Sequence, residues 1–122
     1  MRKIQIFLIG ALGYGIIEIL WRGFTHPSML LAGGICFLAI TQIADYFIDF
    51  STFKKSVLAS FFITAVEMTI GVIVNIGLNL NVWDYSGLPL NILGQICLIY
   101  SVLWLFLSFI IFKVLERIKK YA

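Results

Sequence analysis

Residues 56–78 read SVLASFFITAVEMTIGVIVNIGL and contain one charged side chain, that of Glu67. A helix rises about 1.5 Å per residue, so roughly 20 apolar residues cross the hydrocarbon layer of a bilayer. The run is long enough to do so. Polar residues bound it on both sides, with Lys54 and Lys55 before it and Asn79 after it. Residues 56–78 therefore predict a transmembrane helix.

Three further apolar runs of similar length complete the chain. We expect membrane spans at about residues 4–21, 28–49, 56–78 and 90–113, separated by segments that contain Pro27, Lys54 and Pro89. No stretch alternates apolar and polar residues, which excludes a membrane β-barrel. The pattern predicts an all-α, polytopic membrane protein with four transmembrane helices in one domain, residues 1–122.

The composition agrees with this prediction. Of the 122 residues 61% are hydrophobic and 12% are charged, whereas soluble domains have about 45–50% apolar and about 25% charged residues. A soluble domain, a disordered chain and a disulfide-stapled secreted module are therefore excluded. Cys36 and Cys97 lie in apolar runs and are interpreted as small buried hydrophobes. The formal net charge of +3 comes with no basic patch among exposed aromatics, so no nucleic-acid partner is expected.

The basic residues predict an orientation. Eight of the nine lie at one side of the four spans, and only Arg22 lies at the other: the eight are Arg2, Lys3, Lys54, Lys55, Lys113, Arg117, Lys119 and Lys120. The positive-inside rule then places both termini and the 49–55 loop in the cytoplasm. No small-residue cleavage site follows the first apolar run, so we expect an uncleaved first helix.

A faint internal repeat is also present. Residues 33–37, GGICF, resemble residues 94–98, GQICL. A duplicated two-helix hairpin and a chance likeness between apolar segments both explain this similarity.

Glu67 is the main candidate for a functional residue. A charged side chain at the centre of a span costs at least about 2.5–3.5 kcal/mol, so it needs a partner or water. No basic residue shares the 56–78 span with it. We favour a functional role, with an interhelical hydrogen bond as the structural alternative.

Further polar residues map to the same outer half of the four predicted helices. Glu18 and Arg22 are four residues apart and can form an ion pair, while the loop after residue 78 can form an ordered turn with an aromatic belt. Alternatively these side chains converge on a cleft that opens outward. The candidate substrate-binding residues are Glu18, Arg22, His26, Glu67, Asn75, Asp84, Tyr85, Asn91 and Gln95.

Several known motifs are absent from the sequence. It contains no phosphate-binding glycine loop, no HExxH, no CxxC and no nucleophile elbow. The chain therefore cannot hydrolyse ATP by itself, and no cofactor is expected. The spacing of His26, Glu18, Glu67 and Asp84 fits no metal motif, so no metal site is predicted.

The chain resembles a bacterial family described as putative ABC-transporter type IV, the CmpB-like permeases. The resemblance runs from about Gly13 to Trp104 and rests on Trp21-Arg22-Gly23 with His26, on Glu67 with Gly71 and Asn75, and on Trp83-Asp84-Tyr85-Ser86 with Pro89, Asn91 and Gly94-Gln95. It implies a multi-pass protein of the bacterial cytoplasmic membrane. It assigns no role to any site residue.

Three functions are consistent with these observations. We favour a small transport protein, homo-oligomeric because four helices are few for a translocation path, with an outward-facing polar site around Glu67. The alternatives are an intramembrane enzyme acting on a lipid-linked substrate at the outer leaflet, with His26 as acid and Glu67 or Asp84 as base, and an accessory subunit of a larger complex. An ATPase or a larger membrane subunit is the expected partner, although the 49–55 loop is short for docking an ATPase.

Overall fold

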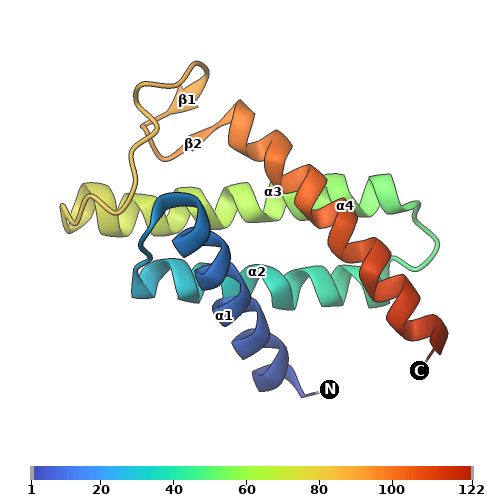
Figure 1. Cartoon of the computed structure of the whole chain (residues 1–122). Coiled ribbons are helices and arrows are strands. Elements are labelled where there is room, and N and C mark those ends of the chain that lie inside the picture. Colours follow the sequence, from blue (N-terminus) through green and yellow to red (C-terminus); the bar gives the residue numbers. More distant parts are fainter. Residues whose placement is uncertain (1, 122) are drawn as a thin grey trace.

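The computed structural model describes residues 2–121, and their side chains as far as residue 118. Its helices are α1 (Lys3–Arg22), α2 (Pro27–Tyr46), α3 (Thr52–Gly71) and α4 (Leu98–Tyr121), as Figure 1 shows. A π-helical segment, η1 (Val72–Gly77), continues α3, and two short strands, β1 (Asn91–Ile92) and β2 (Ile96–Cys97), precede α4. The side chains of Lys119 and Lys120, counted above for the orientation, lie outside the described part.

All four helices are long and apolar enough to cross a membrane, with α3 and η1 forming one span. The exposed surface confirms this interpretation, because large apolar side chains such as Leu20 and Phe61 are exposed while Glu18, Ser56 and Glu67 are buried. Such a distribution suits hydrocarbon and is unsuited to water. The prediction of an all-α membrane protein with four spanning helices is confirmed.

Local signals explain where the helices begin and end. Helix α1 ends at Gly23, whose φ of 84° is the left-handed conformation of a helix C-terminus and whose N–H donates to the Ile19 carbonyl. Helix α2 begins with Pro27 in its first turn. Helix α3 begins after Ser51, whose side chain accepts the Lys54 N–H at 3.2 Å.

The helices pack mainly on their neighbours in sequence. Helix α1 packs against α2, and α4 packs against α3, with α2 and α3 in contact between them; Figure 1 shows α1 and α4 crossing over the α2–α3 pair. A close approach of glycines joins α1 and α2, because a Cβ on Gly33 would lie 2.9 Å from the Gly10 carbonyl oxygen. Two buried apolar clusters result, one around Trp83 and Ile70 and one around Phe112 and Ile63.

The fourth helix begins later than predicted. The prediction placed its start near residue 90, but residues 91–97 form an antiparallel hairpin with Asn91 opposite Cys97, and α4 begins at Leu98. Leu90 and Leu93 have positive φ, as does Gly94 at 71°, which is incompatible with a right-handed helix. Asn91 and Gln95 therefore lie in a hairpin and not on a helix. The orientation and the internal duplication stay predictions.

Candidate functional site

Glu67 lies buried in the second half of α3, with 9% of its surface exposed. Each carboxyl oxygen accepts one hydrogen bond, from the Tyr85 hydroxyl to Oε2 at 3.0 Å and from Trp104 Nε1 to Oε1 at 2.8 Å. Both oxygens therefore act as hydrogen-bond acceptors. Both donors are neutral, and within residues 2–118 no Lys, Arg or His forms an ion pair with Glu67. Within the described residues, the Glu67 carboxyl group is thus held by hydrogen bonds alone.

Aromatic rings fix the two donors. Tyr85 stacks on Tyr100 of α4, with ring centroids 4.6 Å apart, and Trp104 meets the Tyr14 ring edge-on at 5.9 Å. Burial, and after it the negative charge of Glu67, raises the pKa of the Tyr85 hydroxyl above its usual range. The phenol therefore keeps its proton at neutral pH and remains a donor to Glu67.

A second buried carboxylate, Glu18, has a cationic partner. Arg22 Nε donates to Glu18 Oε2 at 2.7 Å, and the Tyr14 hydroxyl donates to Oε1 at 2.9 Å. The predicted pairing of Glu18 with Arg22 is confirmed. Arg22 also donates through Nη1 to the Val82 carbonyl oxygen at 3.1 Å, which ties α1 to the loop before the hairpin. Of these two buried glutamates, Glu18 thus has a cationic partner, whereas Glu67 has none within residues 2–118.

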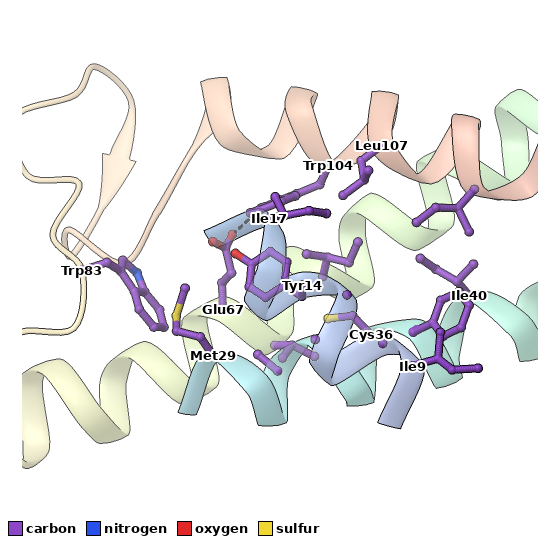
Figure 2. Close-up of a pocket in the computed structure, with 18 residues that line it drawn as sticks. Ile9, Tyr14, Ile17, Met29, Cys36, Ile40, Glu67, Trp83, Trp104 and Leu107 are labelled. Carbon is purple, nitrogen blue, oxygen red and sulfur yellow. Dashed lines mark hydrogen bonds between the residues drawn. The ribbon is translucent and has the colours of Figure 1, made fainter. Parts of the chain in front are cut away.

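A cavity of about 290 Å³ lies against Glu67. All four helices and Trp83 line it, and Figure 2 shows Glu67, Tyr14 and Trp104 around one part of it with Ile9 and Ile40 at the opposite part. Its walls are almost wholly aliphatic and aromatic. Arg22 and Glu18 do not line it. The arrangement presents one carboxyl group to a small apolar space.

Asn75 and Gln95 attach the hairpin to the end of α3. Asn75 Nδ2 donates to Gln95 Oε1 at 2.7 Å, and Asn75 Oδ1 accepts the Val82 N–H at 2.6 Å. Trp83 Nε1 donates to the Gln95 carbonyl oxygen at 3.0 Å. Gly71 permits this contact, since a Cβ there would lie 2.5 Å from Gln95 Oε1. These residues join the loop and the hairpin to the end of the third span, and they do not line the cavity.

The remaining predicted site residues stabilise local turns. His26 Nδ1 accepts the Ser28 N–H at 3.1 Å at the start of α2. The exposed Asp84 accepts the Ser86 N–H at 2.9 Å, a hydrogen bond that lowers the pKa of the Asp84 carboxyl. Asn91 Nδ2 donates to the Leu88 carbonyl oxygen at 2.8 Å. The structure thus brings Glu67 and Tyr85 together. The side chains of His26, Asp84 and Asn91 make their hydrogen bonds elsewhere.

A family model described as "Putative ABC-transporter type IV" matches residues 4–122. The chain belongs to this family. The match confirms the resemblance and extends it beyond Gly13–Trp104 to nearly the whole chain. No curated protein and no solved structure matches. The family and the four spanning helices together make this a multi-pass membrane protein of an ABC-transporter type.

The prediction from sequence did not include two residues of the site, Tyr14 and Trp104. Tyr14 precedes Glu18 by four residues, so the helical repeat alone places both on one face. Trp104 lies 37 residues from Glu67, and no local pattern joins them. Within the described chain no group of three or more His, Cys, Asp or Glu residues could hold a metal ion.

Proposed function

We propose that this chain is a small membrane transport protein whose solute site is the cavity beside Glu67. One observation carries the proposal: a buried carboxyl group within a membrane span, without an ion-pair partner in residues 2–118, borders a cavity of about 290 Å³. An intramembrane ionisable residue of this kind marks a ligand or ion pathway more often than a structural contact.

A purely structural role for Glu67, as a hydrogen-bond partner between helices, does not explain why a carboxyl group stands at this position. Glu67 does join α3 to Tyr85 and to α4 through hydrogen bonds. Helices α3 and α4 are also joined by Ser60, whose hydroxyl donates to the Ser101 carbonyl oxygen at 2.6 Å, and by Thr64, whose hydroxyl lies 2.8 Å from the Ser101 hydroxyl. Neutral hydroxyls make such contacts without the cost of a buried charge. A carboxyl group facing a cavity therefore supports a role in binding.

Partners complete the proposal. Four helices are few for a translocation path, so the working form is a homo-oligomer or a complex with an ATPase or a larger membrane subunit. In this proposal the protein lies in the bacterial cytoplasmic membrane with both termini in the cytoplasm. No observation favours the lipid-linked enzyme, because His26 and Asp84 make their hydrogen bonds to Ser28 and Ser86.

Binding measurements test the proposal. Purified protein in lipid nanodiscs is offered a panel of radiolabelled small amines, amino acids, sugars and organic acids, and any solute that binds is then followed into proteoliposomes. At least one solute should bind the wild type. Its affinity should fall about tenfold or more in Glu67→Gln, because a hydrogen bond to a charged group is lost.

Glu116→Gln is the matched control, since Glu116 pairs with Lys55 and Lys113 away from the cavity. It should bind like the wild type. If no solute binds, or if Glu67→Gln binds and transports every solute as well as the wild type, the proposed site is wrong.

A further inference from the structure

We infer that the cavity takes a lipophilic cation, an amine or quaternary ammonium group that carries compact apolar substituents. The inference rests on the proposed function and names the class of solute.

Charge is the first reason. The Glu18 carboxylate is neutralised by Arg22 at 2.7 Å, whereas the hydrogen bonds to Glu67 come from a phenol and an indole. A ligand that enters beside Glu67 therefore meets a carboxyl group without a cationic partner in residues 2–118, in an apolar setting where the attraction between opposite charges is strong. A cation is stabilised there, and an anion is repelled.

The polar groups of the wall are the second reason. The Tyr14 hydroxyl is used by Glu18, Trp83 Nε1 by the Gln95 carbonyl, and Trp104 Nε1 by Glu67. Among the side chains that line the cavity, the Glu67 carboxyl group is the main hydrogen-bonding group that remains available to a ligand. The thiol of Cys36 is a further, weak donor. A sugar or an amino acid would leave several polar groups unpaired at about 1–3 kcal/mol each. The ligand is thus apolar apart from its charge.

Aromatic rings are the third reason. Tyr14, Trp83 and Trp104 line the cavity together with Glu67, and Figure 2 shows Tyr14 and Trp104 beside its carboxyl group. The negative faces of such rings attract cations, quaternary ammonium groups in particular. A carboxylate flanked by rings therefore favours a diffuse cation over a small hydrated one.

Size and access complete the case. A cavity of about 290 Å³ is at the lower end of the range for ligand pockets, roughly 300–1,000 Å³, so the ligand is small. Helices α1 and α4 both border the cavity, yet α1 packs mainly on α2 and α4 on α3. Tyr14 of α1 and Trp104 of α4 meet at 5.9 Å, so a ligand that enters from the lipid between these helices must pass apolar rings, which an apolar cation can do and a sugar cannot.

Three probes of one shape test the inference in nanodiscs. They are benzyltrimethylammonium, its neutral isostere 2,2-dimethylpropylbenzene, in which carbon replaces the charged nitrogen, and the anion phenylmethanesulfonate. Calorimetry should show that the wild type binds the cation at least about tenfold more tightly than the neutral probe. Glu67→Gln should lose this preference, and Glu116→Gln should keep it.

The comparison of probes on the wild type needs no variant, so the test holds even if Glu67→Gln fails to fold. If the neutral probe or the anion binds as tightly as the cation, the inference is overturned. Glu67-dependent binding of some other solute from the panel would then leave the proposed function standing. If no probe and no panel solute binds, or if extraction shows the cavity filled by a phospholipid that the cation does not displace, the inference and the proposed function both fail.

Discussion

At the scale of single residues, the site depends on a few long-range hydrogen bonds around one carboxyl group. Tyr85 and Trp104 each donate to Glu67, from 18 and 37 residues away. Tyr85 is held in turn by its own N–H, which donates to the Gly94 carbonyl oxygen at 2.7 Å. The hairpin that carries Gly94 therefore controls how one of the two donors meets Glu67.

Gly71 gives a direct test of that dependence. In Gly71→Ala the new Cβ would lie 2.5 Å from Gln95 Oε1 and 3.0 Å from Trp83 Cζ2. We expect a loss of about 1–3 kcal/mol in the free energy of unfolding, because overpacking must move the hairpin away from α3. Thermal unfolding in detergent measures the change. Gly87→Ala is the control, since a Cβ at Gly87 meets nothing within 4 Å. Equal unfolding temperatures of the two variants would show that the hairpin does not rest on α3.

At the scale of secondary-structure elements, hydropathy predicts the apolar helices but not the irregular segments between α3 and α4. Residues 90–97 are apolar enough to be read as the start of the last span. Leu90 and Leu93 have positive φ angles, a conformation for which leucine has no local preference, so no sequence pattern marks these positions. The π-helical turn of η1, which carries Asn75, has no sequence pattern either.

The packing of α1 on α2 makes a prediction at this scale. In Gly33→Ala the added Cβ would lie 2.9 Å from the Gly10 carbonyl oxygen and 2.6 Å from Tyr14 Cβ. The two helices must separate, which displaces Tyr14 from the cavity wall. We expect a lower unfolding temperature and weaker solute binding. Gly13→Ala should unfold like the wild type, because a Cβ there has no neighbour within 4 Å. Wild-type stability of Gly33→Ala would contradict the close helix contact.

At the scale of the whole molecule, the fold class follows from sequence because four long apolar runs have few alternatives to membrane helices. The ion pair of Glu18 with Arg22 was also predictable, since it lies within one helical turn. For Glu67 the sequence predicted a buried carboxyl group, either at an outward-facing polar site or in an interhelical hydrogen bond, but not which residues surround it. Its donors and its cavity depend on four helices at once, and a single sequence does not contain that information.

The orientation of the molecule can be tested by labelling single cysteines in a background without Cys36 and Cys97. Ser86→Cys and Asp49→Cys place a thiol at exposed positions on the two sides. Because the positive-inside rule places residue 86 outside, a membrane-impermeant maleimide should label Ser86→Cys in intact cells. It should label Asp49→Cys only after permeabilisation. The reverse pattern would invert the predicted topology.

Of the two buried glutamates, Glu67 is the one that the cavity makes accessible to an apolar ligand. Dicyclohexylcarbodiimide, an apolar reagent for carboxyl groups, tests this claim when the adducts are located by mass spectrometry of the protein in nanodiscs. Glu67 should be modified. Glu18 should not, because it forms an ion pair with Arg22 and does not line the cavity. Modification of Glu18 with Glu67 left intact would show that the cavity does not give an apolar ligand access to Glu67.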